Sequence, residues 1–64
     1  MKETELWARL RSHLGDAYAR VWAAEYSLAE LGGRTVTEAL AAGDPCKSIW
    51  RAVWNALELP LQER

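Results

Sequence analysis

The chain contains one histidine, His13, and one cysteine, Cys46, the residue types best suited to metal binding or nucleophilic catalysis. A zinc site needs about four ligands, usually His or Cys at short spacing, and this sequence cannot supply them. Ser12 precedes His13, but adjacent residues of a helix point about 100° apart, so the two cannot act as nucleophile and base. We therefore expect no catalytic residues, no metal and no cofactor, and we predict that the protein is not an enzyme.

Two further side chains raise the question of reactivity, the thiol of Cys46 and the carboxylate of Glu25. A helix N-terminus can activate a thiol, but Cys46 also falls on an apolar stripe, where it acts as a small buried residue. We interpret it in the second way and keep a redox role as an alternative. Glu25 flanks apolar residues, so we expect it to reach solvent or to bind a partner such as Arg34, Arg51 or a Trp N–H.

The string Gly32-Gly33-Arg34-Thr35 leads into a predicted helix and has two interpretations. Backbone N–H groups together with Arg34 can hold an anion at such a position. However, the glycine spacing matches neither a phosphate-binding loop nor a dinucleotide-binding fingerprint. Thr35 with Glu38 has the spacing of a capping box, in which each side chain bonds to the other residue's backbone N–H. We therefore predict a tight turn between helices here.

Three positions match the helix-turn-helix pattern A-x3-G-x5-I, namely Ala39, Gly43 and Ile49. The helix that follows would then read DNA with polar side chains able to contact phosphates or bases. These are Lys47, Ser48, Arg51 and Asn55. Against this interpretation, the net charge is −1 and no run of basic residues supplies the phosphate contacts that dominate affinity for DNA. Nucleic-acid binding is therefore kept as the alternative function.

We predict an all-α fold, a single-domain bundle of four short helices joined by tight turns. The predicted helices cover approximately residues 5–14, 17–31, 36–42 and 45–58. Residues that can accept a hydrogen bond from a free backbone N–H precede three of them: Thr4, Asp16 and Asp44. A chain of 64 residues is large enough for one small core, so residues 1–64 form one domain, with residues 1–3 and 61–64 frayed.

Apolar residues at helical spacing predict which side of each helix faces the core. The first helix has such a stripe at Leu6, Leu10 and Leu14, with Trp7 beside it. The second has a seam at Ala17, Val21, Ala24, Leu28 and Leu31, with a second apolar edge at Tyr18, Trp22 and Ala29. The third has Val36, Ala39 and Leu40, and the fourth has Cys46, Ile49, Trp50, Val53 and Leu57. The wide apolar arc of the second helix predicts that it is central and packed on two sides.

Composition predicts where the protein works. A single cysteine allows no internal disulfide, which fits a reducing compartment. The first residues are charged and lead into an amphipathic helix rather than an apolar signal sequence, and no apolar run is long enough to span a bilayer. We expect a cytoplasmic protein that does not bind membranes.

Two aromatic residues lie off the predicted core stripes, Tyr26 on the second helix and Trp54 on the fourth. Tyr and Trp are enriched among the residues that contribute most to binding at protein interfaces. Since a core this small is also only marginally stable, the sequence favours a protein partner or self-association through Tyr26 and Trp54.

The sequence resembles a family of small actinobacterial proteins of unknown function, encoded near the genes for the RecA recombinase and its regulator RecX. The likeness is carried by the string Leu-Gly-Gly-Arg-Thr-Val at 31–36, Trp-Arg-Ala at 50–52 and Leu-Glu-Leu-Pro at 57–60, and by matches at residues 14–19, 22, 29–30 and 38–43.

That resemblance implies a cytoplasmic helical protein without known catalytic residues or cofactor, and an association with recombination or DNA repair through gene neighbourhood alone. The chain departs from the family pattern at two places. It has Glu25-Tyr26 where the family has Asp-His, and Trp54 where the family has a cysteine. No role of that histidine or cysteine transfers to this chain.

Overall fold

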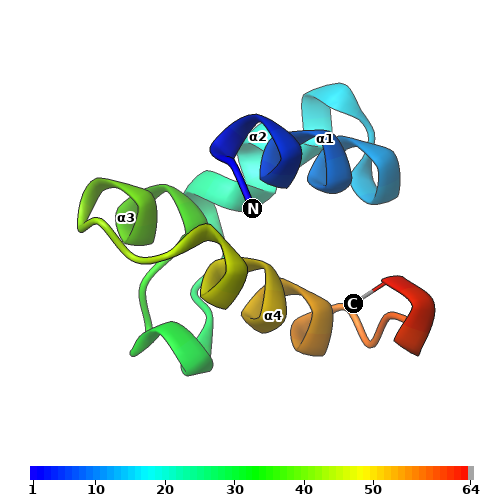
Figure 1. The fold of residues 1–64 in the computed structure, drawn as a ribbon. Coiled ribbons are helices and arrows are strands. Elements are labelled where there is room, and N and C mark those ends of the chain that lie inside the picture. Colours follow the sequence, from blue (N-terminus) through cyan, green and yellow to red (C-terminus); the bar gives the residue numbers. More distant parts are fainter. Residues whose placement is uncertain (64) are drawn as a thin grey trace.

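The computed structural model describes residues 1–63, and their side chains as far as residue 62. These residues form four α-helices and two 3-10 turns, and they contain no strand. The predicted all-α fold of four short helices is therefore confirmed. Helices α1 and α2 pack against each other, and α3 and α4 lie below them in Figure 1, with the loop between α2 and α3 packed against α4.

Helix α1 (Glu3–Leu14) begins two residues earlier than predicted. Its N-cap is Lys2, so the prediction that Thr4 caps this helix is wrong. No side chain caps it, but Glu3 and Glu5 in the first turn place negative charge near the positive end of the helix dipole. The helix ends at Gly15, whose φ of 87° is readily adopted by glycine.

Helix α2 (Asp16–Glu25) is shorter than the predicted range of 17–31. Asp16 is its first residue rather than its cap, and Tyr26 leaves the helix in an extended conformation. Leu28 then forms backbone hydrogen bonds with Gly33 and Arg34 instead of continuing the helix. These bonds fold the chain back through a 3-10 turn, η1 (Ala29–Leu31), and bury the side chains of Leu28 and Leu31. Tertiary packing thus overrides a local helical pattern.

Helices α3 (Val36–Ala41) and α4 (Cys46–Ala56) follow the predicted order with shorter ends. The N-cap of α4 is Pro45, so the prediction that Asp44 caps this helix is wrong. Asp44 instead binds Arg34, as described below. After α4 the chain turns and forms a second 3-10 turn, η2 (Leu61–Glu63). The prediction that residues 61–64 are frayed includes Arg64, and this residue lies outside the described part of the chain.

The core lies between the four helices and the loop that carries η1. Its fully buried large side chains come from α1, α3 and α4: Leu6, Leu10, Val36, Ile49, Trp50 and Val53. The predicted stripes of these three helices are therefore confirmed. The predicted seam of the second helix is wrong within α2 itself, because Ala17, Val21 and Ala24 are exposed and the opposite side, with Ala19, Trp22 and Ala23, faces the core. This orientation buries the large indole of Trp22, flanked by small alanines that let α1 approach closely. The last two residues of the predicted seam, Leu28 and Leu31, are buried as predicted, although they lie beyond the helix.

The capping box predicted from Thr35 and Glu38 is confirmed. The backbone N–H of Glu38 donates to Thr35 Oγ1 at 3.1 Å, and the backbone N–H of Thr35 donates to Glu38 Oε1 at 2.8 Å. We expect Thr35→Ala to lower the free energy of unfolding by about 1 kcal/mol, because the backbone N–H of Glu38 would lose its acceptor. The control is Thr4→Ala, an exposed substitution inside α1 that should change it by less than about 0.5 kcal/mol. Urea unfolding measures both, and equal losses would contradict the assignment.

Candidate interaction surface

The outer side of α2 carries large apolar side chains that nothing in the described chain covers. Tyr18 is 56% exposed, Val21 49% and Tyr26 47%. Only two other large hydrophobic residues with described side chains are exposed, Met1 and Leu61. Exposed apolar area is therefore concentrated on α2 and the residue after it. We call the surface formed by Tyr18, Val21, Glu25 and Tyr26 the α2 face.

The α2 face is hollowed and partly rigid. Its residues and the edge of Trp22 line a shallow depression of about 220 Å³. Trp22 is 93% buried, and its ring stacks on Tyr26 at a centroid distance of 4.9 Å and an interplanar angle of 15°. The core therefore holds Tyr26 in place, although Tyr26 is half-exposed. An exposed aromatic ring that is already ordered loses little conformational entropy on binding.

Small and charged residues surround the α2 face. Ala17 and Ala24 are exposed beside Val21, so the backbone of a partner helix could approach α2 closely. Arg20 is also exposed at the edge, and its charge is opposite to that of Glu25, which is exposed within the face. Glu25 thus reaches solvent, which is one of the two outcomes expected for it from the sequence.

The structure does not bring Tyr26 and Trp54 together. Tyr26 lies beside Ala52 and Ala56 of α4, and both of these point about 160° away from Trp54 around that helix. Trp54 is half-buried, and its indole Nε1 donates to the carbonyl oxygen of Pro60 at 2.9 Å. This hydrogen bond links Trp54 to the segment that follows α4. Its participation in a partner surface stays a prediction.

The residues predicted to contact DNA are all exposed on one side of α4: Lys47, Ser48, Arg51 and Asn55. The side-chain amide of Asn55, however, donates to the carboxylate of Glu30 in η1. An amide that holds a carboxylate is not available to read a base, and the charge of Glu30 repels a phosphate backbone at this end of the helix. The basic side chains that have no carboxylate of η1 next to them therefore all lie in the first half of α4.

The three residues that match the helix-turn-helix pattern have roles in packing. Ala39 and Ile49 are completely buried, and Gly43 has a φ of 87° in the turn between α3 and α4. A small buried residue, a glycine that permits positive φ and a branched core residue also suit a tight connection between packed helices of any function. The pattern therefore predicts the α3–α4 connection correctly and says nothing specific about DNA.

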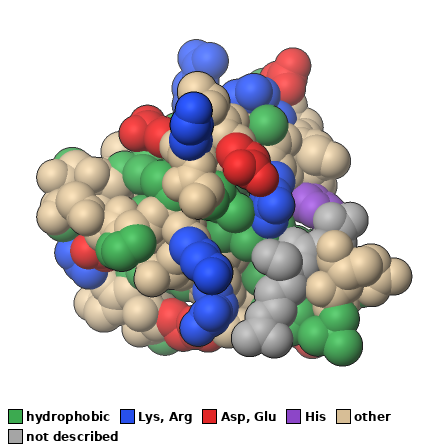
Figure 2. All heavy atoms as spheres, viewed as in Figure 1, with side chains coloured by type: hydrophobic (Ala, Val, Ile, Leu, Met, Phe, Trp, Pro, Cys, Tyr) green, Lys and Arg blue, Asp and Glu red, His purple; other side chains and the backbone are tan. Residues whose placement is uncertain are grey.

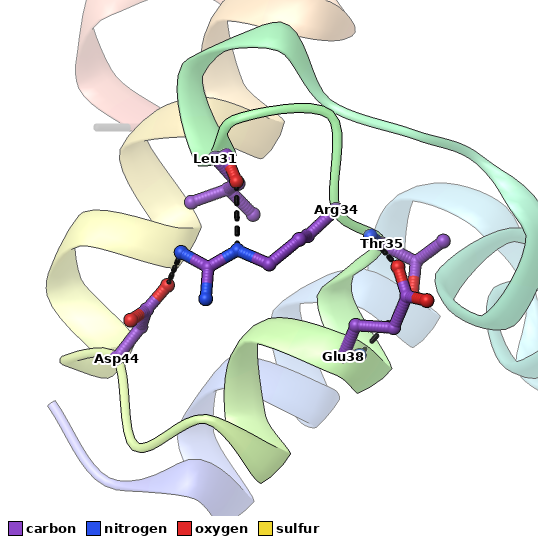
Figure 3. A network of polar contacts seen from close by, with 5 residues as sticks. All are labelled: Leu31, Arg34, Thr35, Glu38 and Asp44. Atoms are coloured by element: carbon purple, nitrogen blue, oxygen red, sulfur yellow. Dashed lines mark hydrogen bonds and ion pairs between the residues drawn. The ribbon is translucent and has the colours of Figure 1, made fainter.

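The Gly32–Thr35 string forms a turn held by side chains rather than an open anion site (Figure 3). Arg34 donates from Nη2 to Asp44 Oδ2 at 2.7 Å and from Nε to the carbonyl oxygen of Leu31 at 2.9 Å. The guanidinium thus ties the turn after η1 to the turn before α4. Because its charge is already paired with Asp44, Arg34 is not available to bind a phosphate, and the interpretation of this string as a tight turn holds.

The single histidine and the single cysteine both pack against the core. His13 stacks on Trp50 with ring centroids 6.0 Å apart, and the guanidinium carbon of Arg9 lies 5.4 Å from the centre of the Trp50 ring. Cys46 is half-buried in the first turn of α4. Among the side chains of residues 1–62, no three from His, Cys, Asp or Glu come close enough together to hold a metal ion.

A family model described as protein of unknown function (DUF3046) matches residues 1–62. The chain belongs to this family. Searches of curated proteins and of solved structures each gave no match. The match to the DUF3046 family covers nearly the whole chain, and the description of the family names no activity, ligand or partner.

No helix in the described part of this DUF3046 protein has the length and apolar character needed to cross a membrane.

Sequence reasoning identified Tyr26 as a surface residue but placed Val21 in an internal seam and Tyr18 beside it. One signal indicates that one side of this helix must stay exposed, although not which side. The second helix has apolar residues on two sides, and three neighbouring helices as short as these cannot cover both.

Proposed function

We propose that this protein is a non-enzymatic interaction module that binds a helix of a partner protein through the α2 face. The observation that carries the proposal is the concentration of exposed apolar side chains at Tyr18, Val21 and Tyr26. Such patches, edged by charged residues, are typical of protein interaction sites. Tyr is among the residues that contribute most to binding energy when it becomes buried in an interface.

The size of the α2 face favours a single helix as the occupant. A large aromatic side chain buries about 150–250 Å², and the three exposed residues are each half-covered already, so together they offer roughly 300 Å². A stable dimer of globular proteins buries about 800 Å² on each partner. Self-association through the α2 face alone would therefore be weak. An amphipathic helix lying along α2 needs less area and can place a side chain in the depression between Tyr18 and Tyr26.

A DNA-binding helix-turn-helix remains the second candidate, and the exposure of Lys47, Ser48 and Arg51 on one side of α4 supports it. The pairing of Asn55 with Glu30 and the net charge of −1 weigh against it, since duplex binding depends on many simultaneous phosphate contacts. We therefore place protein binding first. The gene neighbourhood implied by the family resemblance makes a RecA-type recombinase and its RecX regulator the first partners to test.

Site-specific photo-crosslinking tests the proposal. A benzophenone amino acid at position 21 should give a discrete protein adduct in a lysate of cells that express the protein naturally, before and after nuclease treatment. The matched control places the same amino acid at position 41, an exposed alanine of α3 outside the α2 face. Adducts of equal yield from both positions would contradict the proposal. An adduct that disappears after nuclease treatment would favour the DNA-binding candidate.

A further inference from the structure

The depression in the α2 face combines a carboxylate with aromatic rings. Glu25 lines it together with Tyr18, Val21, the edge of Trp22 and Tyr26. The side chains of Glu25 and Tyr26 are both exposed, so a ligand can reach both from solvent. A carboxylate and the face of an aromatic ring attract the same kind of group, a cation. The depression therefore offers more than apolar contact.

Glu25 has no cationic partner in the part of the chain that the structure describes. Other carboxylates are paired, with N···O distances of 3.0 Å between Arg9 and Glu5 and 2.7 Å between Arg34 and Asp44. Figure 2 shows acidic and basic side chains mixed over the visible face of the molecule. By contrast, no described Lys, Arg or His side chain lies within salt-bridge distance of Glu25. The charge of Glu25 is therefore available to a partner.

The position of Glu25 at the end of α2 adds to this attraction. Glu25 is the last residue of α2, and the last turn carries no basic residue. The helix dipole places partial negative charge at this end, which disfavours a carboxylate and favours a cation. The backbone N–H of Tyr26 donates to the carbonyl oxygen of Trp22. The hydroxyl of Thr37 donates to that of Ala23. Both donors are neutral, so stability of the fold does not explain a carboxylate at this place.

We infer that the partner helix carries an arginine that occupies this depression, which rests on the proposed binding of a helix by the α2 face. A helix that covers Tyr18 and Val21 also covers Glu25, and a carboxylate removed from water without a partner is costly. The planar guanidinium of arginine can donate two hydrogen bonds to the carboxylate of Glu25 and stack on the exposed side of the Tyr26 ring. The ammonium group of lysine is a point charge and cannot do both equally well.

The spacing of residues on α2 also sets the pattern of the partner helix. Val21 precedes Glu25 by four residues and Tyr18 precedes it by seven, which places them about 6 Å and about 10 Å away along the helix axis. A partner helix aligned with α2 therefore needs apolar residues about four and seven positions from its arginine, on the same side. The exposed Ala17 and Ala24 allow such a helix to approach closely.

Selection from a phage-displayed library of helical peptides, each about five turns long and randomised on one side, tests the inference with the full chain. Peptides that also bind Tyr18→Ala are removed, which leaves those that use the α2 face. We expect arginine to be enriched at one position, four and seven residues from apolar positions. Selection on Glu25→Gln should lose this enrichment, because the amide carries no charge. Selection on Glu3→Gln, which removes an exposed carboxylate of α1, should keep it.

Synthetic versions of the selected peptides measure the contribution of the arginine. Its replacement by glutamine should raise Kd about 10-fold for the wild type, since hydrogen bonds between charged groups are lost. For Glu25→Gln the same replacement should raise Kd less than about two-fold, because the two groups no longer interact. The Tm of Glu25→Gln without peptide should equal or exceed that of the wild type, since an unfavourable charge leaves the end of α2.

The two proposals fail in different ways. Peptides that depend on Tyr18 but show no enrichment of arginine over lysine and uncharged residues would overturn the inference and leave the α2 face as a helix-binding surface. An equal effect of the arginine replacement on the wild type and on Glu25→Gln would also overturn it. If no selected peptide depended on Tyr18, the α2 face would not bind helices, and the proposed function would fail together with the inference.

Discussion

Replacing Trp50 by alanine should remove a third or more of the free energy of unfolding at room temperature. Trp50 is only 2% exposed and is the largest fully buried side chain. Removal of a buried Trp to Ala costs about 3–5 kcal/mol, from lost burial and from the cavity that remains. A domain of this size has a total stability of about 3–10 kcal/mol. Helicity at 222 nm and its urea dependence measure the loss.

The matched control for Trp50→Ala is Trp54→Ala on the same helix. Trp54 is only half-buried, so its removal leaves a smaller cavity in the core and should cost clearly less. A further change should accompany Trp50→Ala alone, because His13 stacks on the Trp50 ring. The His13 ring protons should lose their ring-current shifts. A smaller loss of stability from Trp50→Ala than from Trp54→Ala would contradict the description of the core.

Replacing Tyr18 by alanine should weaken binding to the crosslinked partner about 30-fold. Truncation of a central aromatic residue at an interface typically costs about 2 kcal/mol or more, and each 1.4 kcal/mol is a factor of ten in Kd. Because Tyr18 is more than half exposed and lies on the outside of α2, the same substitution should change the free energy of unfolding by less than about 0.5 kcal/mol. Titration calorimetry with the purified partner measures the change in affinity.

Two variants sharpen this prediction. Val21→Asp places a charge at the centre of the α2 face and should weaken binding at least as much as Tyr18→Ala, since a charge buried without a partner is costly. Trp54→Ala lies on the other side of α4 from Tyr26 and should leave the affinity unchanged. If Trp54→Ala weakened binding and Tyr18→Ala did not, the partner surface would lie on α4.

The sequence allows prediction of the helices that pack on one side only. In α1 and α4 a single apolar stripe and a polar remainder leave one way to face the core, and the buried residues are those expected. The capping box of Thr35 and Glu38 is also predictable, because both of its hydrogen bonds are local and depend on spacing alone.

Helix α2 could not be predicted in the same way. It has apolar residues on two sides, and the choice between them depends on where Trp22 finds space in the core, which is a property of the other three helices. Its end at Glu25 depends on backbone pairing of Leu28 with Gly33 and Arg34, residues five and six positions further along the chain. Which residues form the α2 face depends on which side of α2 packs against the core. From the sequence alone, only Tyr26 was predicted to lie on an exposed surface.

Contacts between separate elements could not be predicted for a related reason. Lys47 and Arg51 were recognised as neighbours on one helix, but Arg9 joins them only when α1 packs against α4. The pairing of Asn55 with Glu30 likewise joins residues 25 positions apart. Contacts of this kind depend on the packing of separate elements, and no local pattern predicts them.

The most direct test of the proposed function is an amide-shift footprint of the ¹⁵N-labelled protein with the crosslinked partner, recorded by NMR. We expect the largest shift changes along residues 17–26, with the indole N–H of Trp22 among them because its ring stacks on Tyr26. The amides of α3 should change little. Changes confined to α4 and the start of α1, with the amides of α2 unmoved, would show that the protein binds its partner elsewhere and that the α2 face is not its interaction site.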